Sequence, residues 1–147
     1  MKLSVDNALK EIDIVSGEEE ITVKIAVYDV FFLGRIMEAG DKCDKLNSEL
    51  LEQTPEASAD YKAFIEYYHK SQEIDRQMRD VIDALFNAPV CDTLFPEQQQ
   101  SMFAIGGGAP TWANILAAII DGMDSGLDAE KQKAQARIRK YSAKYKK

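Results

Sequence analysis

The chain has 147 residues, of which 46% are hydrophobic, and it carries a formal net charge of −7. This length is typical of one domain and is enough to bury about two thirds of the surface that the unfolded chain exposes. It contains no run of about 18 apolar residues, and residues 1–9 lack the apolar block of a signal peptide, so we expect a cytoplasmic protein without a membrane partner. We expect Cys43 and Cys91 to be small buried side chains, with a disulfide as the alternative.

The charge is distributed unevenly along the chain. Residues 128–147 include eight Lys or Arg and two acidic residues, a balance of +6, so the preceding 127 residues carry −13. An acidic body disfavours contact with nucleic acid or anionic lipid, whereas the basic segment alone can attract either of them, or the acidic body of a second copy. We therefore divide the chain into one globular domain, residues 1–127, and a basic C-terminal tail, residues 128–147.

The first structured segment is predicted to be an antiparallel β-hairpin over residues 10–28. Apolar residues alternate with polar ones on both sides of Gly17, at Ile12, Ile14, Ile21, Val23, Ile25 and Val27. A period of two indicates half-buried strands, and glycine favours the turn between them. Because an isolated hairpin is only marginally stable, it must pack on helices or extend a sheet with another chain.

Two long helices are predicted next. Asp29 is a suitable N-cap for a helix over about 30–52, and its apolar residues recur at spacings of four and three: Phe32, Ile36, Ala39, Cys43, Leu46 and Leu50. We call these six the apolar seam, because the spacing is that of a coiled coil. After a break at Pro55, a second helix is predicted from about residue 56 or 58 to residue 86. Its polar middle, residues 69–77, is expected to project from the core or to meet a partner, and the two helices form an antiparallel hairpin.

The remaining segments complete a predicted helical core. Residues 89–95 are predicted to form a short helical turn that presents Val90, Cys91, Leu94 and Phe95 to the core, and residues 96–105 a short helix with Met102, Phe103 and Ile105 inward. A third main helix over 110–123 has one apolar stripe, which we predict to be the centre of the core: Trp112, Ile115, Leu116, Ile119, Ile120 and Met123. The predicted fold class is α+β, mainly helical, with the β-hairpin packed on or beside the long helical hairpin.

The basic tail has few apolar anchors. Ile138, Tyr141 and Tyr145 are spaced as on one face of a helix, so we expect a helix that orders only against something else. On this view the tail contributes to binding rather than to folding.

Three short motifs could carry chemistry, and each is incomplete. Glu66-x-x-His69 has the spacing of a di-iron ligand pair, but His69 is the only histidine. Asp121, Asp124 and Asp128 do not follow the order of a calcium-binding loop, and Gly106-Gly107-Gly108 lacks the lysine of a phosphate-binding loop. Serine and cysteine nucleophiles have no plausible histidine base, because the single histidine lies in a charged segment. We therefore expect no catalytic residue, no metal site and no cofactor, and a protein that is not an enzyme.

Several stretches together resemble a family of small proteins from phages and prophages of Firmicutes-type bacteria, the tail assembly chaperones. They are IDIVSGEEEITVKIAV, YDVFFLGRIMEA, IDRQMRDVIDALFNAPVCDTLF, GGGAPTWANILAAIIDGMD and RIRKYSAKY. The resemblance implies a non-enzymatic adaptor that coats the long helices of a tape-measure protein and keeps it soluble until the tail tube protein polymerises. It carries no catalytic residues.

A protein that holds a helical ligand needs exposed apolar surface on a soluble body. The expected partner-binding surfaces are the hairpin edge, the apolar seam at Phe32, Ile36, Leu46 and Leu50, and the tail at Lys131, Arg137, Arg139, Lys140, Tyr141 and Tyr145. A homo-oligomer is a further possibility, in which the tail meets a second copy. The alternative function is a small regulatory protein whose basic C-terminal tail contacts nucleic acid.

Overall fold

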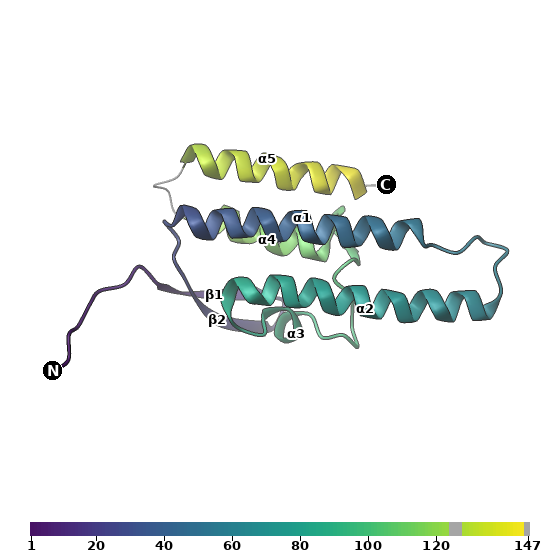
Figure 1. Cartoon of the computed structure of the whole chain (residues 1–147), viewed down its shortest axis with the longest axis horizontal. Helices are drawn as coiled ribbons and strands as arrows, with labels where there is room; N and C mark the ends of the chain where they lie inside the picture. Colours follow the sequence, from purple (N-terminus) through teal and green to yellow (C-terminus); the bar gives the residue numbers. More distant parts are fainter. Residues whose placement is uncertain (124–127, 146–147) are drawn as a thin grey trace.

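The computed structural model describes residues 1–123 and 128–145. It has the predicted α+β fold, mainly helical with an N-terminal β-hairpin (Figure 1). The elements in chain order are β1 (Lys10–Ser16), β2 (Glu19–Ile25), α1 (Val30–Glu52), α2 (Tyr61–Phe86), α3 (Val90–Leu94), β3 (Ile105–Gly106), β4 (Ala109–Pro110), α4 (Thr111–Gly122) and α5 (Asp128–Tyr145).

The β-hairpin forms as its alternating pattern predicts. β1 and β2 pair antiparallel, with Ile12 opposite Val23 and Ile14 opposite Ile21. The turn between them places Gly17 at a φ of +60°, a region that glycine adopts without steric cost. Val23 and Ile25 are buried, and β2 contacts α2 and α3, so one face of the hairpin belongs to the main core.

Helix α1 is the central element, because it contacts α2, α4 and α5. Its predicted start is confirmed: the Asp29 carboxylate accepts a hydrogen bond from the Phe31 N–H at 2.9 Å. The prediction that its apolar seam is exposed is wrong. Phe32, Ile36 and Leu50 are at most 2% exposed, because α2, α4 and α5 of the same chain cover them.

Helix α4 forms the predicted centre of the core. Its six predicted core residues are all at most 8% exposed, namely Trp112, Ile115, Leu116, Ile119, Ile120 and Met123. The Trp112 indole N–H donates to the Asn47 side-chain oxygen at 2.8 Å, which joins α4 to α1 and satisfies the one polar atom of the ring.

The tail is structural, contrary to the sequence-based expectation. Its described residues, 128–145, form α5, which packs on α1 and α4 and buries Ala134, Ile138, Tyr141 and Tyr145. The two tyrosine rings lie against Trp112, with centroid distances of 5.5 and 6.2 Å. The helix therefore orders against its own domain, and no partner is needed to cover its apolar face.

Two predictions about α2 and the segment after α3 also change. The first turns of α2 are exposed. Its polar middle, residues 69–77, is only partly exposed, because Ser71 and Asp75 are buried whereas Gln72, Glu73 and Gln77 face solvent. Residues 96–104 form turns rather than the predicted helix, and Ile105 is 57% exposed in β3. Met102 is fully buried as expected.

The helical hairpin is longer than the rest of the domain. The end of α1, the start of α2 and the connection between them extend beyond α4 and α5, on the right of Figure 1. None of the described helices combines the length and apolar composition needed to cross a membrane.

Candidate functional site

A groove lies along the part of α2 that extends from the body. It has a volume of about 330 Å³ and lies between α2 and residues 97–103. Four aromatic side chains line it: Phe64, Tyr67, Tyr68 and Phe103. We call this surface the aromatic groove. Its polar lining consists of Ser71, Gln72, Asp75, Glu97, Gln100 and Ser101.

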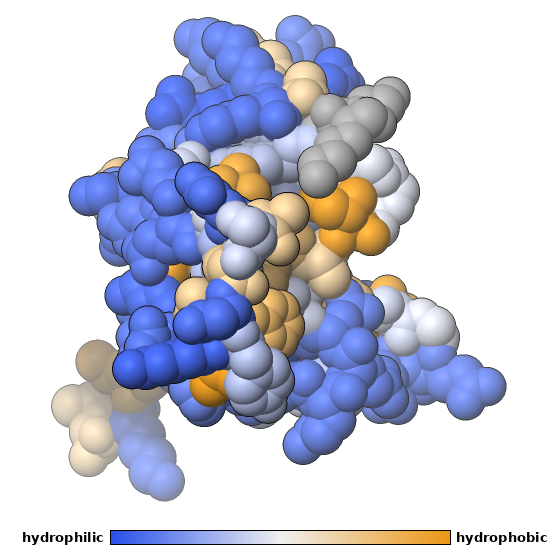
Figure 2. Space-filling model, turned by 90° about the vertical axis from the view of Figure 1, so that its right-hand side faces the viewer, coloured by the Kyte–Doolittle hydropathy of each residue, from blue (hydrophilic) through white to orange (hydrophobic). Residues whose placement is uncertain are grey.

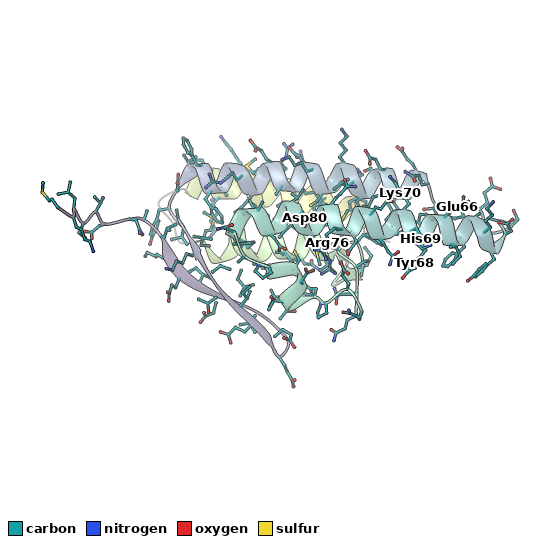
Figure 3. All side chains as sticks on the ribbon, turned by 60° about the horizontal axis from the view of Figure 1, so that its bottom comes forward. Glu66, Tyr68, His69, Lys70, Arg76 and Asp80 are labelled. Carbon is teal, nitrogen blue, oxygen red and sulfur yellow. The ribbon has the colours of Figure 1, made fainter. Side chains whose placement is uncertain are left out.

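The aromatic groove continues into an exposed apolar stripe on α2. Tyr61, Phe64 and Tyr68 follow one another at spacings of three and four, which places them on one face of the helix. Their exposed fractions are 78%, 56% and 48%. Figure 3 shows Tyr68 on the projecting part of α2. Seen from this end, apolar and near-neutral residues occupy the middle of the surface, with hydrophilic residues around them (Figure 2).

A buried ion pair on α2 fixes the other wall of the groove. Arg79 is fully buried, and its Nε donates to Asp75 Oδ2 at 2.8 Å. The two terminal nitrogens of Arg79 donate to the carbonyl oxygens of Phe95 and Gln100, at 2.5 and 2.8 Å. Asp75 in turn accepts the backbone N–H of Met102 at 2.6 Å. Side chains of α2 therefore take the backbone hydrogen bonds that a helix over residues 96–105 would have used.

A second arginine holds the same segment from outside. Arg76 donates to both carboxylate oxygens of Asp92, at 3.2 and 3.1 Å, and also to Glu97, which lines the groove. The hydrogen bonds from Arg76 hold the pKa of Asp92 below its usual value, and a further contribution comes from Arg79. Two arginines one turn apart thus fasten α3 and the groove wall to α2.

Two polar side chains that line the groove, Ser71 and Gln72, already have hydrogen-bond partners on α2. The Ser71 hydroxyl donates to the Tyr67 carbonyl oxygen at 2.8 Å, and the Gln72 amide donates to the Tyr68 hydroxyl at 3.2 Å. His69 Nδ1 lies 3.2 Å from the Gln72 side-chain oxygen. Because Ser71 donates to a carbonyl rather than to a base, its hydroxyl is not activated as a nucleophile, and the groove presents aromatic surface for binding.

The predicted seam residues are not brought to this surface. Phe32, Ile36 and Leu50 are buried in the core, and Leu46 is half-buried and packs against it. The apolar seam therefore holds this domain together instead of forming a groove for a partner.

The predicted tail residues are largely engaged within the chain. Arg137 Nη2 donates to Asp41 at 2.7 Å, and Lys131 Nζ donates to the Met123 carbonyl oxygen at 2.7 Å at the end of α4. The Tyr141 hydroxyl also donates to Asp41, and burial together with this carboxylate raises the pKa of Tyr141 to about 12.

The second tyrosine of the tail is anchored in the same way. The Tyr145 hydroxyl donates to Asp44 at 2.6 Å, and Lys144 pairs with the same carboxylate at 3.2 Å. Arg139 and Lys140 remain on the exposed face of α5. The positive charges of the tail are thus partly neutralised by α1.

The described residues of the three short motifs form no recognisable centre. Gly107 and Gly108 have φ values of +63° and +85° and make the tight turn between β3 and β4, so the glycine run is a connector. Asp124 and Gly126 lie outside the described residues. Cys43 and Cys91 are free and buried. Within residues 1–123 and 128–145, no three His, Cys, Asp or Glu side chains are grouped so that they could hold a metal ion.

Sequence reasoning missed both the exposed stripe and the arginines behind it. Tyr61, Phe64 and Tyr68 fit the apolar pattern of α2, and the pattern alone does not distinguish exposed positions from buried ones. The signal for Arg79 is an acid and an arginine at positions i and i+4 beside the buried Ile74 and Met78, which indicates an internal ion pair.

Comparisons with known proteins give no relative for this chain: no family model, no curated protein and no solved structure matches it.

Proposed function

We propose that this protein is a non-enzymatic adaptor that holds an amphipathic helix of a partner in the aromatic groove. The observation that carries the proposal is the stripe of Tyr61, Phe64 and Tyr68, which are all about half exposed or more and continue into a preformed concave surface. Helix-in-groove recognition uses apolar anchors one turn apart, and aromatic side chains supply large contact areas at low entropic cost.

The charge around the groove favours a basic partner. Residues 49–60, at the end of the helical hairpin, include four acidic residues and no basic one, namely Glu49, Glu52, Glu56 and Asp60. A partner helix whose apolar stripe is flanked by Lys or Arg would meet complementary charge there. The net charge of the whole chain, −7, also favours solubility of the adaptor while its groove is empty.

The resemblance to phage tail assembly chaperones supports a particular partner. A tape-measure protein is a long helical chain that needs its apolar face covered before the tail tube protein polymerises around it. On this proposal, several adaptor molecules bind along that chain, each holding one helical segment in its aromatic groove. The regulatory alternative, in which the tail binds nucleic acid, is weaker because Lys131, Arg137 and Lys144 are engaged by groups of this chain.

The test is co-expression with a tape-measure protein, followed by measurement of the soluble fraction of that protein and of its affinity for the adaptor. Phe64→Gln should weaken binding about tenfold, because loss of a central aromatic anchor costs at least about 1–2 kcal/mol. Phe31→Gln is the matched control, since Phe31 is 73% exposed at the opposite end of α1. Equal binding by both variants, with both still folded, contradicts the proposal.

A further inference from the structure

A second apolar cleft lies at the other end of the molecule, between the β-hairpin and the end of α4. It has a volume of about 220 Å³, and the apolar side chains that line it are Ile12, Ile14, Val15, Ile25, Val27, Ala118, Ile119 and Met123. We call it the hairpin cleft. Ile12 and Ile14 are only half-buried, and Val15 beside them is 60% exposed. A site lined by apolar side chains and left open to water favours an apolar occupant.

The hairpin cleft opens beside a strand edge. Four consecutive residues of β1, 12–15, line it, so side chains of both strand faces contribute. In the described part of the chain β1 pairs only with β2, and its outer backbone N–H and C=O groups have no strand partner. An unpaired edge next to an apolar cleft is the arrangement to which an extended segment adds as a further strand.

Residues 1–9, which we call the N-terminal arm, have the complementary properties. The arm leaves the body as an extended segment (Figure 1). Leu3 and Val5, two positions apart and thus on one side of an extended chain, are 83% and 84% exposed. The only hydrogen bond that the described residues give the arm is local, from the Leu9 N–H to the Asn7 side chain at 3.0 Å.

We propose that the hairpin cleft is filled by the N-terminal arm of a second copy of this chain, which adds as a strand to the edge of β1. The same chain carries both an uncovered apolar arm and an unfilled apolar cleft. Two copies that exchange arms would bury each arm in the cleft of the other copy, in one closed and symmetric contact. The arm contains no glycine or proline to reverse it onto its own cleft.

Charge is compatible with this occupant. Residues 10–25 include five acidic residues and two basic ones, Lys10 and Lys24, a balance of −3. The arm carries Lys2 and Asp6 and is neutral in its side chains, so it can approach the acidic hairpin without repulsion. Lys2, next to Leu3, brings a positive charge to the rim of the cleft, where Asp13 lies.

Light scattering over a dilution series measures the exchange directly. The wild-type chain should show twice the chain mass and dissociate on dilution, whereas Leu3→Asn/Val5→Asn should remain a monomer at every concentration. Ser4→Asn is the control in the same arm, because residue 4 points to the other side of an extended segment. Circular dichroism identifies any variant that is misfolded. A wild-type monomer throughout, or a double variant that associates as strongly as wild type, overturns the proposal.

Disulfide trapping then identifies the occupant. Tagged Val5→Cys chains are mixed with untagged Ala118→Cys chains, since Ala118 is exposed on α4 and lines the hairpin cleft. The native thiols do not compete, because Cys43 and Cys91 are fully buried and burial raises the pKa of Cys43 to about 12.

Oxidation should join tagged Val5→Cys chains to untagged Ala118→Cys chains. The control replaces the untagged partner with Ala84→Cys, because Ala84 is exposed on α2 and lies outside the cleft. This control should give at least about tenfold less mixed disulfide at equal concentration. If instead the Val5→Cys/Ala118→Cys double variant closes a disulfide within one chain and mixed copies give none, the arm covers its own cleft and the exchange is disproved.

Discussion

Arg79 shows how one residue determines the shape of the candidate site. Its guanidinium is fully buried and donates hydrogen bonds to Asp75, to Asp92 and to two backbone carbonyl oxygens. An ion pair in the interior is weak support for stability in itself, but removal of one partner leaves a buried charge without compensation. The groove wall over residues 97–103 therefore depends on this side chain.

We predict that Arg79→Ala lowers the free energy of unfolding by about 3–5 kcal/mol, the range for breaking a buried ion pair. Arg76→Ala is the comparison, because Arg76 contacts the same segment but its side chain is 42% exposed. That substitution should cost less than about 1 kcal/mol, since solvent screens such pairs. Urea denaturation of the three proteins measures both values. Equal losses in the two variants would show that the buried network has no special role.

At the level of elements, a glycine lets α1 approach α5 closely. Gly40 lies where α5 and α4 approach, and a Cβ added there would stand 3.0 Å from a ring carbon of Tyr141 and 3.4 Å from Ile138. The Tyr141 ring cannot move away freely, because its hydroxyl is held by Asp41 and its face by Trp112. Gly34, in the same helix, has no atom within 4 Å of the added Cβ.

Alanine at these two glycines should therefore have opposite effects. Gly34→Ala should stabilise the protein by about 0.5–1 kcal/mol, because alanine loses less backbone entropy in a helix. Gly40→Ala gains the same helix propensity but is expected to cost about 1–3 kcal/mol through overpacking against α5. Thermal unfolding of both variants gives the sign of each change. If Gly40→Ala also stabilises, α5 does not pack on α1 as closely as the structure has it.

The helices that could be predicted from sequence are those with local signals. Helix α1 has a capping aspartate and a regular apolar seam, and its predicted range of about 30–52 matches the observed one. Helix α2 begins later than predicted, because Asp60 caps it by accepting the Ala63 N–H. Residues 96–104 could not be predicted, since side chains of Asp75 and Arg79, some twenty residues away, bind their backbone.

The candidate site was missed for a related reason. Apolar periodicity identifies a face of a helix but does not say how far the neighbouring helices extend. The stripe at Tyr61, Phe64 and Tyr68 is exposed because the helical hairpin is longer than α4 and α5 (Figure 1). The tail, in contrast, was predicted to be unattached but packs on the domain. Asp41 and Asp44, which accept hydrogen bonds from Arg137, Tyr141 and Tyr145, lie about a hundred residues earlier, so no local pattern indicates the attachment.

At the scale of the whole molecule, α5 and α3 are attached through carboxylates, which makes stability depend on pH. The hydrogen bond from Tyr141 holds the pKa of Asp41 below its usual value of 3.8, and Arg137 contributes to a lesser extent. Hydrogen bonds from Arg76 likewise lower the pKa of Asp92. A carboxylate whose pKa is lower in the folded protein contributes stability above its unfolded pKa and loses it as pH falls through the folded pKa. Asp83 acts in the opposite sense, because burial raises its pKa.

The free energy of unfolding should therefore stay constant or rise slightly from neutral to mildly acidic pH, because Asp83 takes up a proton in the folded protein. It should fall steeply below about pH 4, where Asp41 and Asp92 become protonated. Asp41→Asn/Asp92→Asn should be less stable than wild type at neutral pH and show a shallower fall in acid, since the groups that titrate are gone. Asp83→Asn should lose the rise and keep the fall. Urea denaturation at a series of pH values gives the three curves. If the double variant runs parallel to wild type down to the lowest pH, other carboxylates control acid unfolding, and the attachment of α5 through Asp41 contributes little to the stability of the domain.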